Sequence, residues 1–86
     1  MYKKENKWEA LTGGMKLDCY CVNKKRQEGG EHEVHNLSGN PSCLPNGENR
    51  KSLGPHPNCH SALDEARNHY GHVDGCRHCC KECHSR

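Results

Sequence analysis

Residues 72–86 read HVDGCRHCCKECHSR, and the part from Cys76 to His84 places four cysteines and two histidines in nine positions. Such a stretch has three common uses in small proteins: a metal site, a set of disulfides, or one half of a catalytic zinc fold. Each of the three would hold a chain together where other means of folding are few. Which use applies here depends on the rest of the sequence.

The 86-residue chain is poor in the side chains that build hydrophobic cores. It contains six leucines and three valines, but no isoleucine and no phenylalanine. At about 25 cal/mol per Å² of buried apolar surface, this content does not offset an ordering cost of about 1.5 kcal/mol per residue. The eight cysteines and eight histidines are the remaining source of stability. The sequence therefore predicts one small domain with little hydrophobic core.

The N-terminal sequence favours metal over disulfides. Residues 1–14, MYKKENKWEALTGG, are charged at the start and contain no run of seven apolar residues, so they do not resemble a signal peptide. No stretch is long and apolar enough to span a membrane, and no membrane partner is expected. We expect a cytoplasmic location, where thiols serve as ligands more often than as bridges. A mature secreted chain with an added Met and disulfides is the open alternative.

Local patterns predict a short β-hairpin followed by one helix. Residues 15–22 and 31–37 have the composition and alternation of two strands. Residues 38–57 are rich in Gly, Pro, Asn and Ser, so we expect an irregular loop there. A helix of about ten residues should begin with Ser61 as its N-cap and stop at Gly71.

Closely spaced thiol and imidazole donors could fill two tetrahedral zinc sites, because each zinc ion takes four such ligands. The adjacent thiols of Cys79 and Cys80 point in different directions, so they should serve different ions unless only one is a ligand. His69, His72 and His78 are expected at the surface. The candidate pairs are Cys19 and Cys21, His56 and Cys59, Cys76 and Cys79, and Cys80 and Cys83, with Cys43 and His84 in reserve.

Residues 31–36 read EHEVHN, and residues 46–63 read NGENRKSLGPHPNCHSAL. Together they resemble the HNH nuclease module, a ββα-metal fold of the treble-clef kind. Residues 33–36 match the acidic and histidine element of that family's hairpin, residues 48–49 match its middle segment, and residues 56–60 match the knuckle that opens its helix. The resemblance covers about half of the chain. It implies a small α+β zinc-stabilised domain with a treble-clef-like β-hairpin and one short helix.

The resemblance also implies metal-assisted hydrolysis of phosphodiester bonds. His35 and His60 would hold one catalytic divalent ion, and Asn49 would fix the loop by hydrogen bonds. A neutral histidine on the hairpin would activate water as the general base. If His35 has that role, Glu33 would replace it as a ligand of the ion.

The resemblance also implies that Cys19, Cys21, His56 and Cys59 bind a first structural zinc. We assign the tail to a second structural zinc, with Cys76, Cys79, Cys80 and Cys83 as its candidate ligands. Residues 1–14 would form a flexible N-terminal arm, with a short helix over residues 3–11. Residues 15–86 would form a single zinc-binding domain, in which 15–71 are the treble-clef-like part and 72–86 are the Cys/His-rich tail.

Two basic segments are the candidates for contact with DNA or RNA. They lie in predicted loops beside cysteines, where positive side chains can meet phosphates, and they consist of Lys24, Lys25 and Arg26, and of Arg50 and Lys51. A net charge of +2 does not by itself require a nucleic-acid partner. Two other functions therefore stay open. One is a non-catalytic zinc-stabilised adaptor or inhibitor that binds another protein, and the other is thiol redox chemistry or metal storage.

Overall fold

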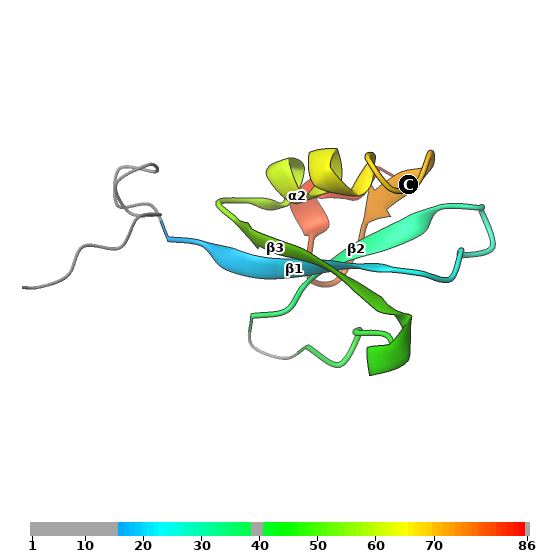
Figure 1. Cartoon of the computed structure of the whole chain (residues 1–86), viewed down its shortest axis with the longest axis horizontal. Helices are drawn as coiled ribbons and strands as arrows, with labels where there is room; N and C mark the ends of the chain where they lie inside the picture. The colour runs from blue at the N-terminus through cyan, green and yellow to red at the C-terminus, as the bar shows by residue number, and fades with distance from the viewer. Residues whose placement is uncertain (1–15, 39–40, 86) are drawn as a thin grey trace, which may run out of the picture.

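The computed structural model describes residues 16–38 and 41–85. The predicted N-terminal arm of residues 1–14 and its short helix lie outside this part of the chain. The described elements are the strands β1 (Asp18–Asn23), β2 (His32–Asn36), β3 (Arg50–His56) and β4 (Val73–Gly75), the helix α2 (Cys59–Ala66), and the 3-10 helices η1 (Gly47–Asn49) and η2 (Lys81–Cys83). They form a small α+β domain, as the sequence predicts (Figure 1). None of the helices described is long and apolar enough to cross a membrane.

The four strands form one sheet in the order β3-β1-β2-β4. Strand β1 is antiparallel to both of its neighbours, so that Val22 lies opposite Val34 of β2 and Lys51 of β3. Strand β4 runs parallel to β2 and places Gly75 opposite Val34. The Cys/His-rich tail therefore contributes a strand to the same sheet as the predicted hairpin.

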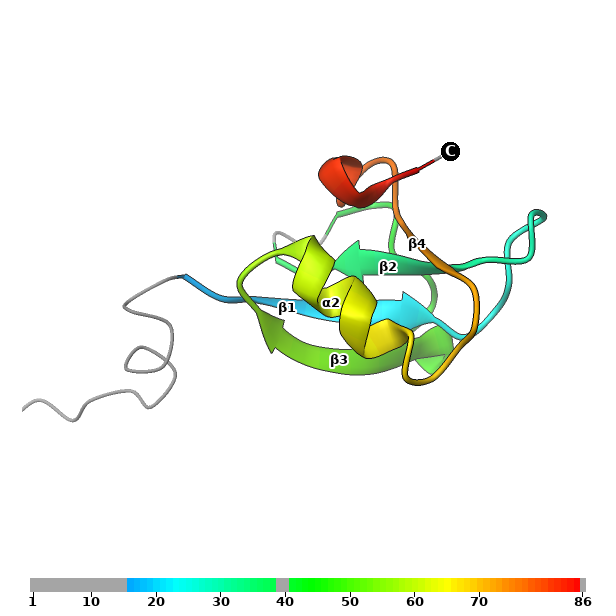
Figure 2. The same ribbon diagram turned by 90° about the horizontal axis from the view of Figure 1, so that it is seen from above.

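The sheet has two different faces, because neighbouring strand residues point to opposite sides. Tyr20, Val22 and Val34 pack on the face that α2 covers. Figure 2 shows α2 lying over the middle of the sheet. Cys21 and His35, which are opposite one another in β1 and β2, point to the other face. Figure 1 shows the segment between β2 and β3 on that second side.

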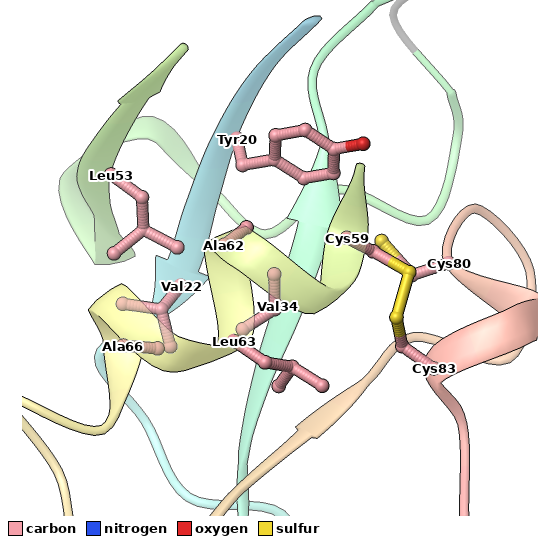
Figure 3. Close-up of a cluster of buried hydrophobic side chains, with 10 residues drawn as sticks. All are labelled: Tyr20, Val22, Val34, Leu53, Cys59, Ala62, Leu63, Ala66, Cys80 and Cys83. Atoms are coloured by element: carbon pink, nitrogen blue, oxygen red, sulfur yellow. A yellow bond between two sulfur atoms is a disulfide. The ribbon is translucent and has the colours of Figure 1, made fainter. Parts of the chain in front are cut away.

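The hydrophobic core between α2 and the sheet is small (Figure 3). Its buried members are Tyr20, Val22, Val34, Leu53, Cys59, Ala62, Leu63, Ala66, Cys80 and Cys83. A disulfide between Cys59 and Cys83 joins the first residue of α2 to the last residue of η2. Because burial of one valine or leucine stabilises by only about 1.5–3 kcal/mol, a core of this size makes additional cross-links important. The prediction of a domain with little core is confirmed.

The helix begins earlier than the sequence predicts and is shorter. Its N-cap is Asn58, whose side-chain oxygen accepts a hydrogen bond of 2.9 Å from the N–H of Ser61. The expectation that Ser61 is the N-cap was wrong, because its hydroxyl is hydrogen-bonded instead to Nδ1 of His56 at 2.7 Å. The buried residues Leu63 and Ala66 lie on one face of α2.

The expectation of an irregular loop over residues 38–57 was wrong for β3. This strand contains Gly54 and Pro55, two residues that usually interrupt strands. An edge strand tolerates proline, because the missing N–H is not needed on its outer side, and β3 is an edge strand of the sheet. Gly54 has φ +80°, a backbone conformation that glycine adopts readily.

The tail folds back over β4 and packs closely against it. A Cβ atom placed at Gly75 would lie 2.7 Å from the Cβ of Cys83 and 3.0 Å from the carbonyl oxygen of Cys80. The backbone N–H and the hydroxyl of Ser85 both donate to Oδ1 of the buried Asp74, each at 3.0 Å. The glycine at position 75 is therefore what allows η2 to approach the sheet.

Candidate metal centre

Four potential metal ligands meet on the sheet face opposite α2. They are His35, Cys43, Cys76 and Cys79, and their ligand atoms all lie within 4.8 Å of one another. His35 and Cys76 are buried, whereas Cys43 and Cys79 are half-buried. We refer to these four residues as the Cys3His cluster. Its members come from β2, from the segment between β2 and η1, and from the turn after β4.

The parallel pairing of β4 with β2 brings the two ends of this cluster together. Cys76 directly follows β4, and its N–H donates to the carbonyl oxygen of Val34 at 2.9 Å, beside His35. A turn then places Cys79, with the N–H of Cys80 donating to the carbonyl oxygen of Cys76 at 2.8 Å. The strand register and this turn thus position three of the four ligands.

The cluster has the dimensions of a tetrahedral metal site. The sulfur of Cys79 lies 3.6 Å from Nδ1 of His35. With metal–sulfur bonds of about 2.3 Å and metal–nitrogen bonds of about 2.1 Å, sulfur and nitrogen ligands of tetrahedral zinc lie about 3.6 Å apart. Three thiols and one imidazole are also a common ligand set of structural zinc sites. The residues therefore fit a zinc ion in both chemistry and spacing.

Backbone amides support two of the sulfurs. The N–H of Asn36 donates to the sulfur of Cys79, and the N–H of His78 donates to the sulfur of Cys76, each at 3.4 Å. Such donors stabilise the negative charge that a sulfur carries when it binds a metal. The protein backbone is thus already arranged for thiolates at both positions.

The second ring nitrogen of His35 is oriented as in a metal-binding histidine. Nε2 is buried and has no hydrogen-bond partner among the described residues. The nearest acidic atom is Oε1 of Glu33, at 3.6 Å. A carboxylate beside the outer nitrogen is the usual second contact of a histidine ligand, because it fixes the ring and makes the inner nitrogen a better donor. His35 thus has its Nδ1 toward the thiols and its Nε2 toward a carboxylate.

Burial favours the uncharged forms of His35, Cys43 and Cys79 when no cation is present. It lowers the pKa of His35 to about 4, with a smaller effect from the charge of Arg50, so the imidazole has a free electron pair at neutral pH. Burial also raises the pKa of the Cys43 and Cys79 thiols. A divalent ion would supply the positive charge that compensates ionised thiols, and its binding would release their protons.

A second group of potential ligands consists of Cys59, His60 and Cys83, whose ligand atoms also lie within 4.8 Å of one another. We refer to it as the Cys2His group. Cys59 and Cys83 are buried and joined by the disulfide that Figure 3 shows, whereas His60 is exposed. While this disulfide is present, the sulfurs of Cys59 and Cys83 are bonded to each other and cannot act as thiolate ligands of a metal.

The structure divides the four tail cysteines that the sequence assigns to one zinc ion. Cys76 and Cys79 belong to the Cys3His cluster. Cys83 is in the disulfide, and Cys80 is buried in the hydrophobic core. Cys79 is half-buried and also packs against the core cluster that contains Cys80, so the two adjacent thiols lie close to one another.

The other expected zinc site is not assembled. Cys19 is exposed and Cys21 is buried. Neither of them belongs to the Cys3His cluster or to the Cys2His group of the described residues. Both ring nitrogens of His56 have other partners, at 2.7 Å from the hydroxyl of Ser61 and 2.9 Å from the carbonyl oxygen of Leu53. The fourth expected ligand, Cys59, forms the disulfide.

The three expected catalytic residues also lie in different places. His35 is part of the Cys3His cluster, on the face opposite the helix that carries His60. Asn49 is in η1, where its carbonyl oxygen accepts a hydrogen bond of 2.8 Å from the N–H of Lys24. The structure does not bring these residues to one ion. His69, His72 and His78 are exposed, as expected.

Sequence reasoning assigned His35 to another role and held Cys43 only in reserve as a ligand. Cys43 has no second cysteine or histidine within three residues, so no spacing marks it as half of a pair. His35 follows Glu33 in a strand pattern, which gives its face but not its partners. Only the tertiary arrangement joins these two residues to Cys76 and Cys79.

Comparison of the chain with models of protein families gave no match, and neither curated protein sequences nor solved structures gave a significant one. The description of the site therefore depends on its geometry. By that geometry the chain is a small cysteine-rich protein, and its described residues contain two groups of Cys and His side chains that are compatible with metal binding.

Proposed function

We propose that this protein is a zinc-stabilised module that binds the phosphate backbone of DNA or RNA and does not cleave it. The observation that carries the proposal is the meeting of two basic segments at one end of the sheet. We refer to these residues as the basic edge: Lys24, Lys25, Arg26, Arg50 and Lys51.

The register of β1 and β3 supports a single basic surface. Asn23 lies opposite Arg50, and the N–H of Lys24 donates to the carbonyl oxygen of Asn49 at 2.8 Å. Residues 24–26 are exposed, and Arg50 and Lys51 are half-buried. Five cations from two segments that are distant in sequence therefore share one end of the sheet, where the exposed Glu48 offsets one charge. Cations in such a group can neutralise successive phosphates.

The Cys3His cluster supports this surface through one segment. The Nε of Arg50 donates to the carbonyl oxygen of Pro45 at 2.8 Å. Pro45 lies two residues after Cys43, a member of the cluster. A zinc ion bound to Cys43 would hold this segment against the sheet and with it the partner that orients Arg50. Zinc would then increase the affinity for nucleic acid by stabilising the position of Arg50, without contacting the nucleic acid itself.

Binding without cleavage is favoured by the arrangement of the histidines. Phosphodiester hydrolysis assisted by a metal needs an ion with an open coordination position near the substrate. The Cys3His cluster offers four protein ligands, the closed form typical of structural zinc. His60 lies on the other side of the sheet from His35, so the two do not supply such an ion together.

The experiment is a titration of labelled DNA duplex and single-stranded RNA with the zinc-loaded protein, followed by fluorescence anisotropy at several salt concentrations. Four neutralised phosphates predict that affinity for duplex falls about 100-fold between roughly 50 and 200 mM salt. Changing both Lys24 and Lys25 to Gln should about halve the slope of log affinity against log salt. The matched control changes Lys16 and Lys81 together to Gln, because both are exposed lysines outside the basic edge.

An equal loss of affinity in the protein with Lys16 and Lys81 changed to Gln would show that binding follows net charge and not the basic edge. Absence of binding at about 50 mM salt would refute the proposal. In that case the alternative of an adaptor or inhibitor with a protein partner would be favoured. Addition of Mg²⁺ or Mn²⁺ to the same samples tests cleavage, and we expect the nucleic acid to stay intact.

A further inference from the structure

The disulfide between Cys59 and Cys83 lies within a set of residues that has the composition of a metal site. In the Cys2His group, a ring nitrogen of His60 and both sulfurs lie within 4.8 Å of one another. Cys59 and His60 are the first two residues of α2, and Cys83 is the last residue of η2. A disulfide alone would not need an imidazole at this distance from both of its sulfurs.

We propose that the Cys2His group is a redox-dependent metal site, which is a disulfide when oxidised and binds a second zinc ion when reduced. The two states exclude each other, because zinc binds thiolates and the sulfurs of a disulfide have no such charge. The inference does not depend on the proposed binding of nucleic acid. It also involves none of the residues of the Cys3His cluster.

The exchange balances with a low-molecular-weight thiol as the reductant. Two molecules of that thiol break the S–S bond, leave Cys59 and Cys83 as thiols, and become one small disulfide. Zinc then displaces the two thiol protons, forms two Zn–S bonds, and accepts an electron pair from a ring nitrogen of His60. After zinc dissociates, a small-molecule disulfide such as oxidised glutathione accepts the two electrons and restores the bridge.

The surroundings suit both states. Cys59 is at the N-terminus of α2, where the partial positive charge of the helix favours a thiolate. His60 is exposed, so its ring can turn toward the sulfurs at little packing cost. Because the disulfide and the metal each connect α2 with η2, the tail stays attached to the helix in either state.

The reduced site would have an open coordination position. Three protein ligands leave one corner of the zinc tetrahedron free, as in zinc sites that bind an external ligand. Cys59 and Cys83 are buried but His60 is exposed, so an external ligand would approach the ion from the side of His60. The ligand there would be water, a small anion or an external thiolate. The open position distinguishes the reduced Cys2His group from the Cys3His cluster, which has four protein ligands.

The test counts zinc ions per chain by native mass spectrometry of the full-length protein before and after reduction. The reductant is tris(2-carboxyethyl)phosphine, which takes up oxygen from water as it reduces the disulfide and adds no thiol ligand. We expect one more zinc per chain in the reduced protein than in the oxidised one. Cobalt substitution should give the matching optical result, a larger sulfur-to-cobalt absorption after reduction.

Three variants locate the additional ion. The His60→Ala protein should keep the disulfide, but its affinity for the second zinc should fall about 100-fold or more. Even the loss of a residue that only supports a ligand lowers metal affinity about 10- to 100-fold. His69→Ala, which removes an exposed histidine just after α2, is the matched control and should change nothing. Changing Cys59 and Cys83 together to serine should abolish the difference between the two redox states.

Equal zinc counts in the oxidised and reduced proteins would overturn the proposal. It would also be overturned if the His60→Ala protein bound the additional zinc as tightly as the unchanged chain. Loss of the far-ultraviolet helix signal on reduction in the presence of zinc would count against it as well, because the reduced site requires α2 to be folded. None of these results depends on the affinity of the protein for nucleic acid.

Discussion

Replacement of Cys43 by serine is the sharpest test of the Cys3His cluster. Cys43 is half-buried and lies in a segment without helix or strand. The exchange of sulfur for oxygen at such a position should by itself change the free energy of unfolding by only about 0.5 kcal/mol. Its main effect should be the loss of one of the four ligands, and so of the stabilisation that zinc provides.

The magnitude follows from the linkage of binding and folding. Zinc present at 100 times its dissociation constant stabilises the folded state by about 2.7 kcal/mol. For a domain of roughly 60–100 residues, each kcal/mol shifts Tm by about 4–8 °C. Addition of zinc should therefore raise the Tm of the unchanged protein by roughly 10–20 °C. The Cys43→Ser protein should gain only a few degrees.

The assay is thermal unfolding followed by circular dichroism, with and without zinc and without reductant, so that the Cys59–Cys83 disulfide stays intact. Cys21→Ser is the matched control, because Cys21 is 1% exposed on the same face of the sheet but outside the cluster. A buried hydroxyl should lower its stability by about 1–3 kcal/mol, yet its zinc-induced shift should be complete. A full shift in the Cys43→Ser protein would refute the assignment of this ligand, and no shift in the unchanged chain would refute the whole cluster.

Three further substitutions test other parts of the structure. Gly75→Ala should lower the free energy of unfolding by about 1–3 kcal/mol in urea titrations, because its new Cβ would meet the Cβ of Cys83 at 2.7 Å; unchanged stability would show that η2 is not packed on β4. Asn58→Ala should cost about 0.5–2 kcal/mol through loss of the N-cap, with most of it regained in Asn58→Asp, and equal losses in both would contradict the cap. Glu33→Ala should weaken zinc binding about 10- to 100-fold in chelator competition, because His35 loses the carboxylate at its outer nitrogen, whereas unaltered affinity would exclude that contact.

The strands and the helix differ in how far local sequence determines them. The two strands of the hairpin are predictable, because apolar residues such as Val22 and Val34 alternate with polar ones and face one side. Strand β3 is not, since Gly54 and Pro55 are normally read as breakers. Only its position at the edge of the sheet, which is a property of the complete fold, makes both residues acceptable.

The metal cluster was predictable in part for a similar reason. The two-residue gap between Cys76 and Cys79 indicates a shared ion, and the structure brings these two thiols together. Their partners could not be inferred from spacing, because His35 and Cys43 are more than 30 residues away from Cys76 in the sequence. The parallel register of β4 against β2 decides that contact, and no local pattern encodes it.

The parallel pairing of β4 with β2 has a consequence for the order in which the protein is made. Strand β2 finds its outer neighbour only among residues that are synthesised much later, so the closure of a long loop must come first. A nascent chain that has released residues 16–66 from the ribosome already contains the hairpin and the helix. The side of β2 that will pair with β4 is still without a partner at that point, and the ligands Cys76 and Cys79 have not yet been synthesised. The native fold is therefore completed only after residue 83 emerges, and until then the exposed edge of β2 is open to aggregation or chaperone binding.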